Sequence, residues 1–209
     1  LPNVNVDIGK NVNVIAIPNV NVATLPNVNV ANLPLTVFGE MLVGQLMPVT
    51  AWRFDYGLNE RIATSVASNG AAVTIDQSRA KLSTSSNTTG LASITSVKPL
   101  RYMPGVGGLF RGTAVFATAR ANTQQILGIG DASDGLFFGY NGTSFGIMTR
   151  RAGSDTWVAS ASWNGTALGE TLTPTFGNVY QIRYQWLGYG LLRFYIFDKT
   201  VKDFVLVHT

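Results

Sequence analysis

The stretch NVYQIRYQWLG, residues 178–188, sets the fold class of this 209-residue chain. Its apolar and polar side chains alternate along an extended strand, with glutamine and arginine on one side. The other side carries Tyr180, Ile182, Tyr184 and Trp186. Such alternation is typical of a half-buried strand in an antiparallel sheet. The run GLLRFYIFD follows after Gly188-Tyr189-Gly190, and the two runs together predict a β-hairpin.

The same pattern of short strands and turn residues extends outward from this hairpin. Asn141-Gly142 lies between two apolar runs in FFGYNGTSFGIM, and Asn164-Gly165 lies in ASWNGTAL, so both dipeptides predict hairpin turns. Helical periodicity is absent. We therefore predict an all-β fold whose head is an antiparallel jelly-roll, concanavalin-like sandwich. Further strands are expected near residues 51–57, 71–76, 91–96, 112–120, 124–130 and 156–163.

The N-terminal residues have a different pattern, a strict repeat that is eight residues long. The string NVNV recurs at residues 3, 11, 19 and 27, which places valines on one face of an extended strand and asparagines on the other. Proline occupies the second place of the eight-residue unit at residues 2, 18, 26 and 34, and Lys10 takes that place in the remaining unit. Because proline cannot donate to a sheet ladder, it marks the start of each short strand.

An energy estimate indicates that one copy of this repeat does not fold alone. Ordering eight backbone units costs about 8 to 16 kcal/mol, whereas burying a leucine, a proline and two valines returns about 6 to 9 kcal/mol. Three chains that each supply one octad per layer would close a homotrimeric β-stalk with the valines inside. The alternative is an extended arm on a neighbouring subunit, which needs a partner equally. The valines expected to hold the assembly together are Val4, Val6, Val12, Val14, Val20, Val22, Val28 and Val30.

These patterns divide the chain into three segments. We expect an eight-residue β-repeat stalk or arm at residues 1–35, a neck at 36–50 and a sandwich head at 51–209. No linker rich in serine or glycine separates them, so stalk and head should be stiffly coupled. The final run FVLVHT is strand-like with no turn after it, and we expect the head to continue beyond it.

Composition excludes several classes of chemistry. The absence of cysteine excludes disulfides and thiol catalysis. The sole histidine, His208, lies at the end of an expected strand, a poor place for a catalytic triad. Glu40, Glu60 and Glu170 are far apart in sequence and form no alternating acidic run, although a pair of carboxylates assembled in space would serve a glycosidase. We therefore predict a non-enzymatic protein without a cofactor, with a polysaccharide depolymerase as an alternative.

Charge and hydropathy limit the classes of binding partner that the chain is expected to have. The 15 basic residues are dispersed rather than clustered, which argues against nucleic acid. Charged residues interrupt every apolar run before it could span a membrane. Only 12% of residues are charged, a low share that indicates a surface partly covered by copies of the chain or by partners.

A few side chains are candidates for binding. Asp131 and Asp134 lie in a Gly-flanked loop, where they would offer oxygen ligands to Ca²⁺ or simply cap the turn. Trp157, Trp163 and Tyr189 have rings that would either stack on sugars or pack between sheets.

Two strings, GLFFGYNGTSFGI and GNVYQIRYQWLGYG, resemble a family of virion structural proteins from tailed phages and large aquatic DNA viruses, and the resemblance covers about residues 50–209. It implies a β-sandwich head on a fibre, tail or capsid appendage, and it carries over no catalytic residue. The leading interpretation is a trimeric fibre or spike on the particle surface that contacts other virion proteins and a host-surface glycan. A carbohydrate-binding lectin domain is the alternative from another class.

Overall fold

The computed structural model describes residues 47–101, 103–185 and 190–209. The chain divides into two units, Leu1–Leu46 and Met47–Thr209, and all the described residues belong to the second. The octad repeat and its eight valines lie outside the described residues, as do Glu40 and Tyr189. The trimeric stalk and the extended arm, together with the boundaries near residues 35 and 50, therefore stay predictions.

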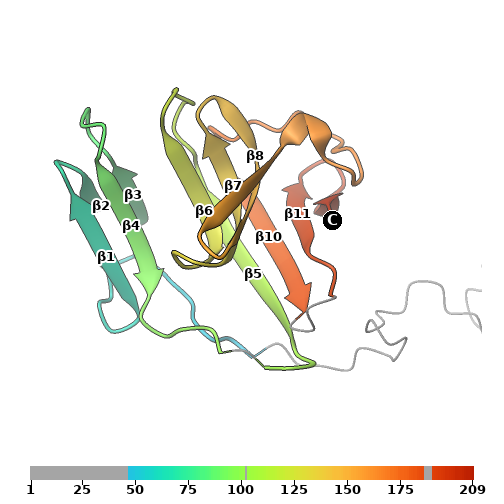
Figure 1. The fold of residues 1–209 in the computed structure, drawn as a ribbon, viewed down its shortest axis with the longest axis horizontal. Helices are drawn as coiled ribbons and strands as arrows, with labels where there is room; N and C mark the ends of the chain where they lie inside the picture. Colours follow the sequence, from blue (N-terminus) through green and yellow to red (C-terminus); the bar gives the residue numbers. More distant parts are fainter. Residues whose placement is uncertain (1–46, 102, 186–189) are drawn as a thin grey trace, which may run out of the picture. The chain divides into compact units, whose positions relative to one another are not determined.

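All strands in the described part of the chain pair in antiparallel fashion (Figure 1), in agreement with the predicted all-β class. A single turn of 3-10 helix, η1 (Ser160–Ser162), is the helical element among the described residues, and no helix there is long and apolar enough to cross a membrane. The strands are β1 (Ala63–Ser68), β2 (Ala72–Asp76), β3 (Arg79–Ser83), β4 (Leu91–Ser96), β5 (Gly107–Ala114), β6 (Gln124–Gly130), β7 (Gly135–Asn141), β8 (Ser144–Arg151), β9 (Ser154–Ala159), β10 (Asn178–Gln185), β11 (Arg193–Asp198) and β12 (Asp203–His208).

Strands β5 to β12 form two four-stranded sheets around one core, a sandwich-like arrangement (Figure 1). Their orders are β12-β11-β10-β5 and β6-β7-β8-β9. Side chains of both sheets meet in a single apolar cluster, in which the ring of Phe138 lies 5.0 Å from that of Tyr180 and 5.4 Å from that of Phe194. The alternation in residues 178–185 is explained by this cluster, because Tyr180 and Ile182 are fully buried in it.

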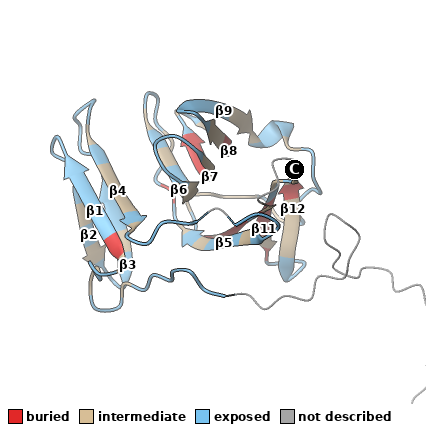
Figure 2. Ribbon diagram, turned by 60° about the horizontal axis from the view of Figure 1, so that its bottom comes forward, coloured by how far each residue is buried: buried red, intermediate tan, exposed pale blue. Residues whose placement is uncertain are grey.

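Strands β1 to β4 form two smaller ladders, β1 with β4 and β2 with β3. Their burial is slight: Ala63 is their only fully buried apolar side chain, while Val66, Leu82 and Leu91 are each about half exposed. Figure 2 shows β1 as an almost entirely exposed strand with one buried residue. The main core cluster contains no described residue of these four strands.

Several predicted strands are confirmed, and one is wrong. The strands at 91–96 and 124–130 have the expected bounds, and those at 71–76, 112–120 and 156–163 overlap β2, β5 and β9. Residues 51–57 form no strand. Their alternation ends in a turn at Gly57, which has a φ of +118°, and the neighbouring Tyr56 is fully exposed. Without a paired strand, the pattern alone does not produce a ladder.

Two of the three predicted hairpins are confirmed. Strands β10 and β11 pair as expected, and β7 pairs with β8 through a two-residue loop of Gly142 and Thr143. Gly142 has a φ of +60°, as the first loop residue of a II′ turn requires.

The hairpin at Asn164-Gly165 is wrong, because this segment runs beside β12 instead. The backbone N–H of Gly165 donates to the carbonyl of Val207 at 3.0 Å, and that of Thr166 donates to Leu206 at 2.8 Å. A Cβ at Gly165 would overlap the carbonyl oxygen of Leu206. At this position glycine allows two backbones to approach each other closely, and it does not form a turn.

Candidate binding site

A cavity of about 560 Å³ lies where the β7–β8 turn, the η1 segment and the following loop meet. Strand β7 contributes Tyr140, β8 contributes Phe145, and the turn between them contributes Thr143. The loop after η1 adds hydroxyl and carboxylate groups to this aromatic wall. Ser160 of η1 lines the cavity, together with Trp163, Thr166 and Glu170 of the loop.

Trp163 joins the cavity to the core. The 3-10 turn ends at this residue, whose backbone N–H donates to Ser160 at 3.3 Å. Its indole ring packs edge-to-face on Phe138 and Phe145, each at 6.3 Å between ring centres. The indole Nε1–H is buried without a partner. A buried donor of this kind is stabilised by any acceptor that reaches it, such as a hydroxyl of a bound ligand.

The loop that carries the cavity wall is fixed by a buried carboxylate. Asp198 accepts hydrogen bonds from the backbone N–H of Gly169 at 2.5 Å, of Thr200 at 2.7 Å and of Val201 at 3.1 Å. Burial alone would raise the pKa of Asp198, but these hydrogen bonds outweigh it and hold the pKa below its ordinary value. Glu170 accepts from the backbone N–H of Lys199 at 3.0 Å, so its carboxylate is also engaged in holding the loop.

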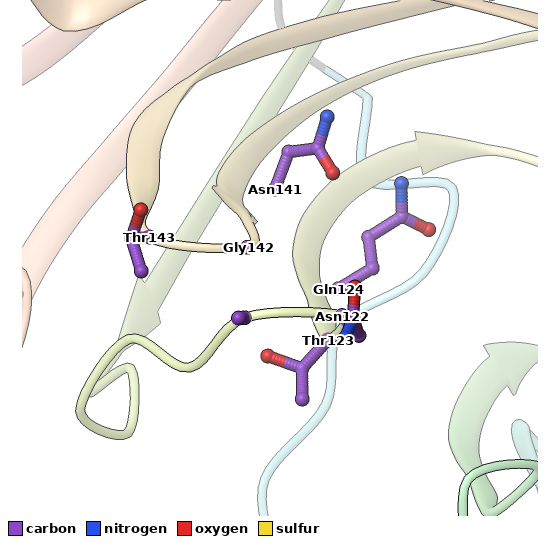
Figure 3. Close-up of a pocket in the computed structure, with 7 residues that line it drawn as sticks. Asn122, Thr123, Gln124, Asn141, Gly142 and Thr143 are labelled. Atoms are coloured by element: carbon purple, nitrogen blue, oxygen red, sulfur yellow. The ribbon is translucent and has the colours of Figure 1, made fainter.

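A second, shallower hollow of about 460 Å³ adjoins the same β7–β8 turn (Figure 3). Its wall is polar, and it shares Thr143 with the first cavity. The backbone N–H of Gly142 donates to the carbonyl of Thr123 at 2.8 Å, which ties the turn to the segment before β6. The other lining residues are Ala121, Asn122, Gln124 and Asn141.

Of the three aromatic residues predicted to contact a glycan, Trp163 lines the cavity. Trp157 lies on β9 opposite Met148 of β8, and it does not line either hollow. Tyr189 is not among the described residues. The predicted residues are therefore not brought together, and two residues that line the cavity, Thr143 and Thr166, were not predicted from the sequence. No local signal marks these two threonines, because the turn and the loop meet only in the folded chain.

Asp131 caps the turn between β6 and β7, and Asp134 joins this turn to the one between β8 and β9. Oδ1 of Asp131 accepts from the backbone N–H of Ser133 at 2.7 Å and of Asp134 at 2.9 Å, and these hydrogen bonds lower the pKa of Asp131. Oδ1 of Asp134 accepts from the backbone N–H of Ala152 at 3.2 Å. Within residues 47–101, 103–185 and 190–209, no group of three or more His, Cys, Asp or Glu side chains gathers to hold a metal ion. The geometry favours the turn-capping interpretation of these aspartates.

His208 takes part in a clasp at the end of β12. Its Nδ1 accepts from the backbone N–H of Asn164 at 3.3 Å, and Oδ1 of Asn164 accepts from the backbone N–H of Thr209 at 2.9 Å. The histidine ring also lies 6.4 Å from that of Phe194. These contacts connect the loop after η1 to the last strand.

No protein-family model, curated protein or solved structure matches this chain. The resemblance to virion proteins therefore stands on its two sequence strings, which correspond to the β7–β8 hairpin and to β10 with the segment that follows it.

Proposed function

We propose that the chain is a non-enzymatic structural component of a virus particle, most like a phage fibre or spike, in which the octad repeat joins three copies and a jelly-roll head contacts the host surface. The observation that carries this proposal is the strict eight-residue spacing of NVNV. A repeat that lacks the buried area to fold alone requires partners, and identical copies supply the same register to one another. Three linked heads would strengthen weak surface contacts through avidity.

The described part of the chain supports a recognition role for the head. The cavity wall combines aromatic rings with hydroxyl groups. The carboxylate in this wall, that of Glu170, accepts a hydrogen bond from the backbone N–H of Lys199. Such a wall can orient a neutral, hydroxyl-rich ligand.

The stalk proposal is tested by the mass of the chain in solution. We expect residues 1–209 to form a trimer and residues 36–209 to be monomeric, as measured by light scattering at the same concentration. A full-length monomer contradicts the proposal. A trimer that persists after deletion of residues 1–35 contradicts it too, because the contacts would then lie in the head.

A second candidate function is carbohydrate binding at the cavity. Trp163 has an unpartnered indole N–H, and Thr143, Ser160 and Thr166 line the same cavity with hydroxyl groups. A glycan array probed with the full chain should identify a ligand. Trp163→Phe, which retains an aromatic ring but removes the N–H, should weaken its binding, whereas Trp157→Phe should not. Equal binding by all three proteins, or none by the wild type, excludes this site.

A further inference from the structure

Three arginines lie on the outer face of the β12-β11-β10-β5 sheet, and we call them the arginine face: Arg111 on β5, Arg183 on β10 and Arg193 on β11. Their positions alternate with residues of the core, since Phe110, Ile182 and Phe194 belong to or pack against the core cluster. Successive residues of a strand point to opposite sides of the sheet, so the arginines point away from the core. All three are exposed.

No carboxylate neutralises these charges within the described strands. The only acids on the four strands are Asp198 and Asp203, which are opposite each other in the core-facing register. The ion pairs of the described chain, Arg53–Asp55 and Arg150–Asp155, include none of the arginine face.

Two of the arginines are direct cross-strand neighbours. Arg183 is paired in register with Arg193, and directly opposed side chains on one face of a sheet lie about 5 Å apart at Cβ. Like charges in this position destabilise a sheet. An anion bound between the two guanidinium groups would attract both of them, so that the net electrostatic interaction at this pair would become favourable.

The guanidinium groups are held in place by their neighbours. Nε and Nη2 of Arg111 donate to Oε1 of Gln181 at 3.1 and 2.7 Å, and its guanidinium carbon lies 4.4 Å from the centre of the Phe204 ring. The guanidinium of Arg183 lies 4.7 Å from the centre of the Tyr195 ring. Stacking fixes the plane of a guanidinium and leaves its remaining N–H groups free to form paired hydrogen bonds to a carboxylate.

Gln181 provides a separate indication of a ligand. It sits in register between Arg111 and Tyr195 on this outer face, yet its side chain is completely buried. Its Oε1 is used by Arg111, while its Nε2 amide has no hydrogen-bond partner. A buried donor without an acceptor is costly, and an anionic oxygen at the face would satisfy it.

We propose that the arginine face binds the carboxylates of a linear acidic polysaccharide. The unused polar groups of the arginines and of Gln181 are donors, which suits a ligand rich in acceptor oxygens, whereas the Oε1 of Gln185 on the same strand is an unpartnered acceptor. Arg111 and Arg193 lie two strands apart and are offset by two residues along the strands, a separation of about 12 Å. Successive carboxylates along an extended chain can therefore each meet a guanidinium. We thus name a ligand class for the surface attachment proposed above, and the inference rests on that proposed function.

Other anionic polymers fit this surface less well. Single-stranded nucleic acid binds to sheets by stacking bases on exposed aromatic rings, but the rings of Phe204 and Tyr195 are already stacked against arginines. An acidic peptide would add as a strand at a sheet edge, whereas the arginine face includes the interior strands β10 and β11.

The test is titration calorimetry of the full chain with polygalacturonate, with neutral dextran, dextran sulfate, oligo(dT) and poly-aspartate as comparisons. We expect polygalacturonate to bind most tightly and neutral dextran not to bind. The double variant Arg183→Gln/Arg193→Gln should lose at least about tenfold in affinity for polygalacturonate.

The matched control is Arg120→Gln/Arg151→Gln, which removes the same charge from exposed positions outside this sheet. It should change the affinity by no more than about twofold. Equal losses in the two double variants, no binding of polygalacturonate, or tighter binding of any other polymer would each overturn the inference. Light scattering of the same samples separates the two proposals, because a trimer that fails to bind refutes only the ligand, and a monomer that binds refutes only the stalk.

Discussion

At the scale of single residues, Asp198 shows how one carboxylate holds two distant segments together. It ends β11, caps the turn that leads to β12, and also accepts from Gly169 in the loop that carries the cavity wall. An amide in its place would keep the shape but lose the charge that strengthens these hydrogen bonds. The cavity therefore depends on a residue that does not line it.

We predict that Asp198→Asn lowers the melting temperature by several degrees, whereas Asp203→Asn, an exposed neighbour, leaves it nearly unchanged. The folded pKa of Asp198 lies below its unfolded value of 3.8. Its contribution is therefore fully present above that value and is lost as the pH falls through the folded pKa. Melting curves recorded from pH 7 to pH 2 check this. The difference between wild type and Asp198→Asn should narrow below pH 4, and a constant difference would show that the charge is irrelevant.

At the scale of elements, the β6-β7-β8-β9 sheet has two glycines paired across its centre. Gly139 of β7 is opposite Gly146 of β8, and both are buried. A Cβ at Gly139 would overlap the carbonyl oxygen of Gln125, and one at Gly146 would overlap that of Val158. The close approach of neighbouring strand backbones is thus possible only without side chains at these positions.

We predict that Gly139→Ala destabilises the chain by about 3 kcal/mol, because the backbone of β6 must move to make room. The control is Gly142→Ala in the β7–β8 turn, where a Cβ meets open space and the cost of about 1 kcal/mol comes from the φ of +60°. Urea denaturation measures both. Equal costs for the two variants would mean that β6 and β7 are less closely packed than described.

The four strands β1 to β4 should open more readily than the sandwich. Val66, Leu82 and Leu91 are about half exposed, whereas Tyr180, Ile182 and Ile196 are fully buried. Local opening costs least where little apolar surface is buried. We expect the amides of β1 to β4 to exchange with deuterium well before those of β10 and β11. Equal protection in the full chain would indicate that copies of the chain cover these strands.

Sequence patterns predicted the elements that satisfy local rules. The strands at 91–96 and 124–130 lie where the sequence patterns predicted them. The β10–β11 pairing follows from alternation, since Tyr180, Ile182 and Phe194 are buried on one face of these two strands. The β2–β3 turn was missed because it uses Gln77 and Ser78, with φ of +50° and +58°, where glycine or asparagine is normal.

The candidate site was less predictable than the strands. Trp163 was identified, but the rest of the cavity wall comes from a turn and a loop far apart in sequence. Asn-Gly dipeptides also gave different outcomes. Asn141-Gly142 leads into a hairpin, whereas Asn164-Gly165 lies along β12, and only the strand partners distinguish the two. Tertiary contacts of this kind have no local signature.

At the scale of the whole molecule, assembly is the central question. If valines line a three-chain stalk, carboxylates placed among them would repel one another and would replace buried apolar side chains with charged groups. We predict that Val20→Asp combined with Val28→Asp dissociates the trimer while the head keeps its near-ultraviolet circular dichroism. The control Asn19→Asp with Asn27→Asp adds the same charge on the opposite face and should leave the trimer intact. A trimer in the valine variant would show that the valines are not buried.

The register of Arg183 with Arg193 has a consequence for the response of the protein to ionic strength. Mobile ions screen repulsion between exposed charges, with a screening length of about 10 Å at 0.1 M salt. Arg193→Gln should therefore be more stable than the wild type by about 0.5 kcal/mol in dilute buffer, and this advantage should shrink as sodium chloride is added. Added salt should thus relieve the repulsion at this pair in the free chain, and a bound polyanion would act as its permanent counterion.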